Sequence, residues 1–208
     1  MLPGGLKAQP IRLSSWLYVF TSPALIVIML VTLLSMSGQF ASLTYLAPYM
    51  RQGFGAGPTG VATAFAVIGI GGVIGNYVAS RVVVRFGVDL CVLVALLLLV
   101  AGMSLIALFY GSFQMAMAGA LLWGLGSFSS NSVQQSRLVA AMPALAAATV
   151  ALNTSAVYLG QSLGAAAGGL VVAQGIGPLL SWVSAGLLGL AAIVSVIASR
   201  LKTPAQRA

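Results

Sequence analysis

Residues 88–109 read VDLCVLVALLLLVAGMSLIALF, an apolar run with one charge, Asp89, near its start. About 20 mainly apolar residues are enough for a helix to cross the hydrocarbon core of a bilayer. This run is apolar on every side, which is typical of a helix that faces lipid. The whole chain has the same character, because 60% of its 208 residues are hydrophobic and 5% are charged. Such a composition excludes an ordinary soluble enzyme, a disordered chain and a disulfide scaffold.

Further segments of the same kind predict an all-α membrane protein with six transmembrane helices over residues 16–200. Short loops rich in glycine and proline separate them, which leaves an N-terminal segment, 1–15, and a C-terminal tail, 201–208. The expected spans are Trp16–Gln39 (continuing toward Pro48), Pro58–Val83, Val88–Phe109, Phe113–Gln135, Ala144–Ala173 and Pro178–Ser199.

The basic residues predict the orientation of these spans. With six spans, only Arg51 lies on one side of the membrane, and Arg137 belongs to a loop between the fourth and fifth spans. Because cytoplasmic loops carry an excess of Lys and Arg, we expect both terminal segments in the cytoplasm. The positive charges are scattered singly, so we expect no nucleic-acid binding. The residues on the cytoplasmic side are Lys7, Arg12, Arg81, Arg85, Arg137, Arg200, Lys202 and Arg207.

Glycines at helical spacing mark two of the spans. The second span contains Gly71 and Gly75, and the fifth contains Gly160, Gly164 and Gly168 at four-residue intervals. Such a stripe lets the backbone of another helix approach closely. Two interpretations stay open at this point, namely packing within the chain and contact with a second bundle.

Polar residues gather on the first, fourth and fifth spans. Because amides in hydrocarbon are costly unless paired, they are expected to face other helices or a water-filled path. Structural hydrogen bonds between helices are the alternative. We expect no titratable side chain deep inside a span, and we expect Asp89 to interact with its helix N-terminus and with Arg85. The sequence has no metal-ligand cluster and no catalytic set, so we expect no metal, no cofactor and no enzymatic activity.

Three stretches resemble a known family. They are TYLAPY at 44–49, GNYVASR at 75–81 followed by Arg85-Phe86-Gly87, and 153–169 with its Asn-Thr-Ser and glycine pattern. In these stretches the chain resembles the C-terminal half of a major facilitator superfamily transporter, in the drug and sugar (arabinose efflux permease-like) efflux branch. Val84 stands where the family often has Asp, so a gating salt bridge through that carboxylate is not expected. Arg81 and Arg85 are then left to contact helix C-terminal carbonyls or lipid phosphates.

The resemblance implies a 3+3 inverted repeat that forms half of a twelve-helix fold. It implies that the first and fourth spans line a central cavity, that the second and fifth contact the other half, and that the third and sixth face lipid. The implied substrate-cavity candidates are Gln39, Tyr45, Trp123, Ser127 and Asn131, followed by Asn153, Tyr158 and Gln161.

The implied function is that of half a secondary active transporter in a bacterial inner membrane. It would be an efflux permease for a small organic solute or drug, working by alternating access with a second six-helix bundle. The chain would then be a fragment or a split gene product, or would pair with a partner or with a second copy of itself. The alternative function is that of a non-transporting membrane remnant or an assembly subunit.

Overall fold

The computed structural model describes residues 22–175 and 177–201, and throughout this part the chain is helical and contains no strand. Residues 16–21 of the expected first span, the segment 1–15 and residues 202–208 lie outside the described residues. The elements are α2 (Pro23–Leu43), α3 (Leu46–Phe54), α4 (Pro58–Phe86), α5 (Val88–Leu108), α6 (Phe113–Ala141), the 3₁₀ turn η1 (Pro143–Leu145), α7 (Ala146–Ala173) and α8 (Leu179–Arg200).

Proline and glycine set most of the helix ends. Pro58 opens α4 and Pro23 lies in the first turn of α2, where the missing N–H costs no hydrogen bond. Gly55 ends α3 with a φ of 63°, a left-handed conformation that only glycine adopts readily. The expected continuation of the first span toward Pro48 is interrupted, because α2 ends at Leu43 and α3 begins separately.

Five helical stretches in the described part are long and apolar enough to cross a membrane. They are α2, α4, α5, the stretch Pro143–Ala173 and α8. Helix α6 is as long as α4, at 29 residues, but it is not among the five. Its C-terminal half is rich in Ser, Asn and Gln, which lowers its hydropathy. Hydropathy therefore supports five of the six predicted spans, and α6 is the exception.

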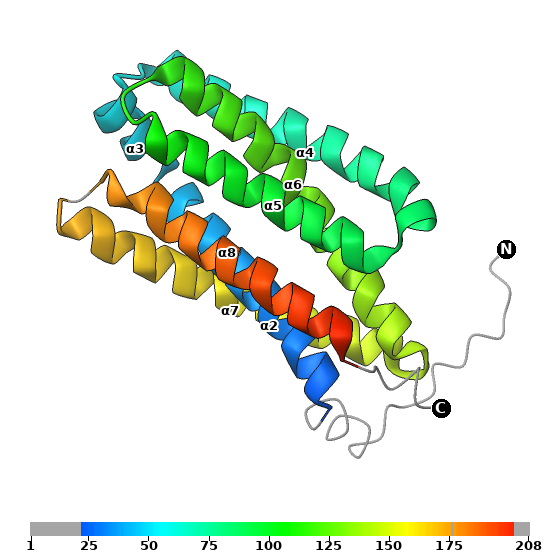
Figure 1. The fold of residues 1–208 in the computed structure, drawn as a ribbon. Helices are drawn as coiled ribbons and strands as arrows, with labels where there is room; N and C mark the ends of the chain where they lie inside the picture. Colours follow the sequence, from blue (N-terminus) through cyan, green and yellow to red (C-terminus); the bar gives the residue numbers. More distant parts are fainter. Residues whose placement is uncertain (1–21, 176, 202–208) are drawn as a thin grey trace, which may run out of the picture.

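The long helices form two groups that lie side by side (Figure 1). In the α6 group, α6 packs against α4 and α5. In the α2 group, α2 packs against α7 and α8. Helix α5 packs against α8 and joins the groups. The first long helix thus lies with the last two, so each group combines segments that are far apart in the sequence.

The connections alternate between the two ends of the bundle (Figure 1). The turns around Gly55, Gly111 and Gly175 lie at one end. The turns at Gly87 and Met142 lie at the other end, where α2 begins and α8 ends.

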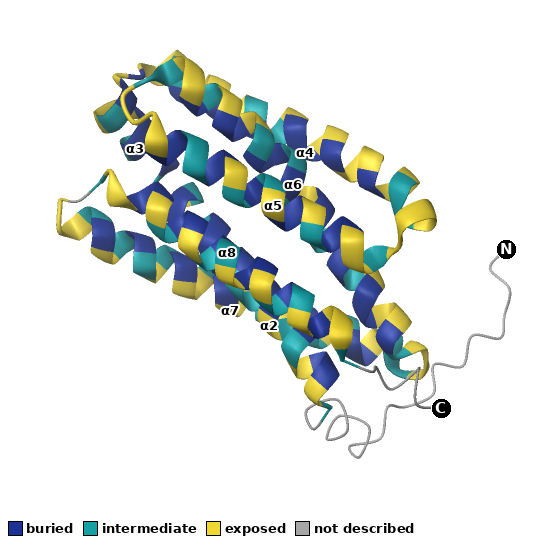
Figure 2. Ribbon diagram, in the orientation of Figure 1, coloured by how far each residue is buried: buried dark blue, intermediate teal, exposed yellow. Residues whose placement is uncertain are grey.

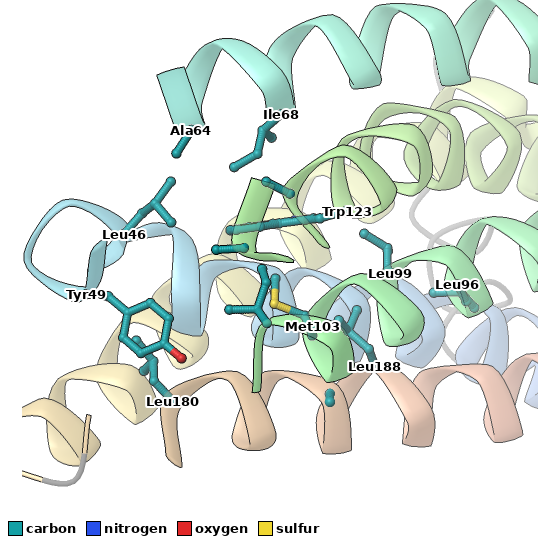
Figure 3. Packing of buried hydrophobic residues seen from close by; sticks show 14 of the residues in the cluster. Leu46, Tyr49, Ala64, Ile68, Leu96, Leu99, Met103, Trp123, Leu180 and Leu188 are labelled. Atoms are coloured by element: carbon teal, nitrogen blue, oxygen red, sulfur yellow. The ribbon is translucent and has the colours of Figure 1, made fainter. Parts of the chain in front are cut away.

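The apolar core runs through both groups. Trp123 of α6 is 1% exposed and lies among side chains of α4 and α5 (Figure 3). Leu180 and Leu188 continue the same cluster on α8. Exposed residues alternate with buried ones along each long helix (Figure 2), so each helix buries one stripe and leaves another uncovered.

Candidate functional site

The glycine stripes meet helices of the same chain. A Cβ atom at Gly71 would lie 3.0 Å from the carbonyl oxygen of Leu121 on α6. At Gly75 it would overlap the backbone of Leu125 on the same helix. The stripe on α7 meets α2 in the same way, with Gly160 against Leu33, Gly164 against Ser37 and Gly168 against Ala41. Both stripes therefore bring two helix backbones into direct contact inside this bundle.

Hydrogen bonds between side chains hold the α2 group together. The Thr32 hydroxyl donates to Asn153 Oδ1 at 2.7 Å, which joins α2 to α7. The hydroxyls of Ser42 and Ser184 lie 2.7 Å apart and join α2 to α8. The Tyr45 hydroxyl, just beyond α2, donates to the backbone oxygen of Ala165 on α7 at 3.1 Å. These bonds use the polar groups for packing between helices.

Tyr49 of the short helix α3 makes a similar contact with α8. The Ser181 hydroxyl of α8 donates to the Tyr49 hydroxyl at 2.9 Å. Burial raises the pKa of Tyr49 to about 12, and the bond from Ser181 offsets only part of that effect. The Tyr49 hydroxyl therefore stays protonated at neutral pH.

A small polar cavity lies between α2, α5 and α6. Its volume is about 10 Å³, close to the minimum that holds one water molecule. The side-chain nitrogen of Gln134 donates to the backbone oxygen of Ile28 at 2.6 Å, which fixes the amide orientation. Gln134 Oε1 and Asn131 Oδ1 are buried and accept no hydrogen bond from the described residues. The polar residues that line the cavity are Thr32, Ser35, Ser130, Asn131 and Gln134.

Arg137 is buried within α6, which corrects its predicted position in a loop. The helix runs on to Ala141, and the Arg137 side chain is 4% exposed. Its Nε lies 2.7 Å from Asp89 Oδ1 at the start of α5, and its other nitrogens donate to the hydroxyl and backbone oxygen of Ser195 on α8. Asp89 lies in the first turn of α5, as expected, but its ionic partner is Arg137 and not the expected Arg85. Arg137 is buried, and a buried charge without a counter-charge is costly, whereas the exposed Arg85 can be solvated by water.

Arg81 and Arg85 are exposed at the C-terminal end of α4. The Arg81 guanidinium lies 5.2 Å from the centre of the Tyr77 ring, and that of Arg85 lies 5.4 Å from the Phe86 ring. The chain has one acidic side chain, Asp89, and it pairs with Arg137. Both arginines therefore lack an acidic side-chain partner from this sequence.

The cavity candidates differ in how far the structure buries them. Gln39, Trp123 and Asn153 are enclosed within the bundle, and Gln39 donates to the backbone oxygen and the hydroxyl of Ser35. Tyr158, by contrast, is 64% exposed. Tyr45, Ser127, Asn131 and Gln161 are half-buried.

An open groove of about 530 Å³ lies between α6 and α7 near their connection, beside Val139, Ala140, Pro143 and Val150. Its polar lining is Ser132, Gln135 and Ser136. Along the exposed face of α7, Thr154, Ser155 and Ser162 donate to carbonyls of their own helix. No cluster of three or more His, Cys, Asp or Glu side chains that could hold a metal ion occurs in the described part.

Sequence reasoning missed several polar residues that join the helices. Thr32, Ser184 and Ser195 each stand in an otherwise apolar stretch, and each bonds to a helix distant in the sequence. An isolated polar residue in a span signals such a bond. Its partner does not follow from the local sequence.

Comparisons with known proteins give a consistent picture. A family model described as Major Facilitator Superfamily matches residues 7–208. The inner membrane transport protein YdhP of Escherichia coli O157:H7 is 30% identical over 205 residues, which cover 97% of this chain and 51% of that protein. An uncharacterized MFS-type transporter of Bacillus subtilis, YfhI, is 27% identical over 86% of this chain and 44% of its own length.

A third relative carries a different kind of name. The protein named transcription regulatory protein OpdE of Pseudomonas aeruginosa is 30% identical over 88% of this chain and 45% of its own length. The chain thus spans about half the length of the curated relatives that it matches.

Proposed function

Because the chain belongs to the major facilitator superfamily, we propose that it forms one six-helix half of a secondary active transporter. It is an integral membrane protein with a transport role rather than an enzyme. In the proposal, a second six-helix bundle, from a partner or a second copy, completes the substrate path, and alternating access moves a small organic solute or drug outward. The family match over residues 7–208 is the observation that carries the proposal.

The pattern of helix packing supports a 3+3 repeat. If α2 is taken as the counterpart of α6, α4 of α7 and α5 of α8, each main packing pair corresponds to a main packing pair. The pairs α2–α7 and α6–α4 are exchanged, as are α2–α8 and α6–α5, and the pair α5–α8 maps onto itself. The two glycine stripes lie in exchanged pairs. This correspondence favours a crossing α6 that is equivalent to α2, despite its polar residues.

The exposed faces of α4 and α7 support the place proposed for a second bundle. These two stretches bury the smallest share of their apolar windows, 28% and 22%. Each uses its glycine stripe inside the bundle and leaves large side chains uncovered. Tyr77 and Val73 are exposed on α4, and Leu163 and Leu170 are exposed on α7. Helices with one face packed and the other open suit the boundary between two halves.

The polar groove between α6 and α7 supports a substrate path along this boundary. Its three polar side chains, Ser132, Gln135 and Ser136, offer hydrogen-bonding groups at the surface of the bundle. Among the earlier candidates, those with accessible side chains are the ones we place on this path. They are Tyr45, Ser127, Tyr158 and Gln161, whereas Asn131 lines the small internal cavity.

Proton coupling would need a titratable group from the second bundle. Asp89 is the one acidic residue of the chain, and Arg137 already neutralises it. The carboxylates of proton relays lie within the membrane, whereas Asp89 lies at a helix start.

The basic residues favour cytoplasmic termini in a bacterial inner membrane, because eight of the nine Lys and Arg residues fall on that side of the six predicted spans.

Reconstitution tests the proposal. The purified chain is placed alone in liposomes with an imposed pH gradient, and internal pyranine fluorescence and ethidium movement are followed. We expect no gradient-driven flux above that of protein-free liposomes, because the chain supplies no free titratable group within the membrane, even where two copies complete the path. Saturable, gradient-driven flux with the chain alone would contradict the proposal that this group comes from a different bundle. Differently tagged copies, purified together, test whether a second copy supplies the other bundle.

A further inference from the structure

A groove of about 370 Å³ lies between α4 and α5. The two helices run side by side from the turn at Gly87 (Figure 1), but each packs mainly against α6 and hardly against the other. Helix α6 therefore forms the floor of the groove. Val78, Val82 and Phe86 line it from α4, and Leu90, Val94 and Leu98 line it from α5.

The lining offers almost no hydrogen-bonding side chain. Ser129 on the floor is its one polar side chain apart from the Cys91 thiol. The Ser129 hydroxyl donates to the backbone oxygen of Leu125 at 2.7 Å, so its one proton is already used. A polar ligand would lose its hydration in this groove without gaining a partner. The chemistry of the groove therefore fits a hydrocarbon chain.

The length of the groove matches one leaflet of a bilayer. The lining residues of α4 run from Gly75 to Phe86. At a rise of 1.5 Å per residue this is about 16 Å. The hydrocarbon core of a bilayer is about 30 Å thick, so the groove covers about half of it. The half is the one next to the end where the α4–α5 turn lies, on the side that we have proposed to be cytoplasmic.

Two positive charges lie on the last turns of α4, the helix that forms one wall of this groove. Arg81 and Arg85 are one helical turn apart on the last turns of α4 and are exposed. Arg85 lies over the ring of Phe86, which itself lines the groove. With Asp89 occupied by Arg137, neither has an acidic partner in the sequence. Guanidinium groups bind phosphate through paired hydrogen bonds, and juxtamembrane basic residues attract anionic lipids.

We propose that the α4–α5 groove binds an acyl chain of an anionic phospholipid of the cytoplasmic leaflet, with Arg81 and Arg85 holding the lipid phosphate. The side of the membrane rests on the orientation proposed above. The binding itself requires no transport, so it can be tested independently of the transporter function.

Native mass spectrometry of the purified chain, titrated with phosphatidylglycerol, measures this binding. Neutralising both arginines in Arg81→Gln/Arg85→Gln should weaken binding about 30-fold, which is the typical effect of two basic residues near an anionic membrane surface. The matched control, Arg51→Gln on α3, removes an exposed charge at the other end of the bundle and should leave binding unchanged. A melting temperature in lipid-free detergent equal to that of the parent shows that each variant is folded.

A second pair of variants tests the groove. Val94→Trp fills it from a position that is 47% exposed and should weaken binding at least tenfold. Ile193→Trp is a control at a 61% exposed position on α8, outside the groove. It should bind as the parent does.

Ligand controls separate the parts of the lipid. Phosphatidylcholine with the same chains should bind more weakly than phosphatidylglycerol, and glycerol phosphate should not bind. Equal binding of the two lipids, or no effect of the paired Arg substitutions, would overturn the proposal in favour of nonspecific lipid contact or of an acidic partner from a second bundle. Tight binding of glycerol phosphate, or no effect of Val94→Trp, would also overturn it, because the groove would then have no part.

Discussion

The α6 group and the α2 group share one arrangement but are held together differently. In the α6 group, large side chains fill the space between helices, with Trp123, Leu99 and Met103 almost fully buried. In the α2 group, Thr32–Asn153 and Ser42–Ser184 join the helices by hydrogen bonds. Among the described residues, the Asp89–Arg137 pair is the one side-chain hydrogen-bonding or ionic contact between helices of the α6 group.

Comparing the α6 group with the α2 group shows which packing interactions they have in common. In lipid no hydrophobic effect drives helices together, so close packing and hydrogen bonds must do so. Both groups use a glycine stripe to bring backbones into contact, Gly71 and Gly75 in one and Gly160, Gly164 and Gly168 in the other. The glycines are therefore the common element. Both groups also bury apolar side chains, and the α2 group adds hydrogen bonds between its helices.

The largest expected effect comes from filling the glycine stripes. Gly75→Leu and Gly164→Leu each place a side chain where a Cβ already overlaps a facing backbone. Each should cost about 3 kcal/mol or more of stability, because the helices must separate. Thermal unfolding in detergent measures the loss, with Val94→Leu as a control that should change little. If Gly164→Leu left the stability unchanged and Gly75→Leu lowered it, the two stripes would not have the same role.

Removing the large core side chain should affect the α6 group about as strongly. Trp123→Ala leaves a cavity among α4, α5 and α6 and should cost about 3–5 kcal/mol. Trp182→Ala, at a 45% exposed position on α8, is the matched control and should cost less than about 1 kcal/mol. Equal losses, measured by thermal unfolding of the two variants, would mean that Trp123 is not a packing residue.

The buried ion pair should respond unequally to the loss of its two partners. Asp89→Asn leaves the Arg137 charge buried without its carboxylate and should cost about 2 kcal/mol. Arg137→Met leaves a half-exposed Asp89, which water can solvate, and should cost less than about 1 kcal/mol. Denaturation of both variants at neutral pH checks the order, and the reverse order would show that Asp89 is the more dependent partner.

The smallest effects should come from the hydrogen bonds of the α2 group. Ser42→Ala removes one bond between α2 and α8 and should cost about 0.6 kcal/mol, the average for such bonds in membranes. Adding Ser184→Ala should cost little more, because the partner hydroxyl is already unpaired. Additive losses in a double-mutant cycle would show that the two serines act separately.

Local sequence signals predicted the ends of several helices but not the contacts between them. The starts at Pro58 and Val88 follow from the proline and the preceding glycine. Gly164 was recognised as a close-packing residue, but its partner Ser37 lies on the first long helix. The sequence around Gly164 does not indicate that it contacts Ser37.

Burial also depends on the assembled fold. Arg137 was expected in a loop because the fourth span was expected to end at Gln135, yet α6 continues to Ala141 and Arg137 pairs with Asp89. Trp123 was expected in a cavity, and the structure places it among core side chains. In both cases the surroundings come from neighbouring helices, which hydropathy along one helix does not report.

Whether α6 crosses the membrane decides between six spans and five, and single-cysteine labelling tests it directly. In a Cys91→Ala background, Ser112→Cys precedes α6 and Ala144→Cys follows it. A membrane-impermeant maleimide on intact cells should label the cysteine at position 112. It should label the cysteine at 144 only after permeabilisation. Labelling of both positions from the same side would mean that α6 does not cross, and the six-helix half-transporter would be contradicted.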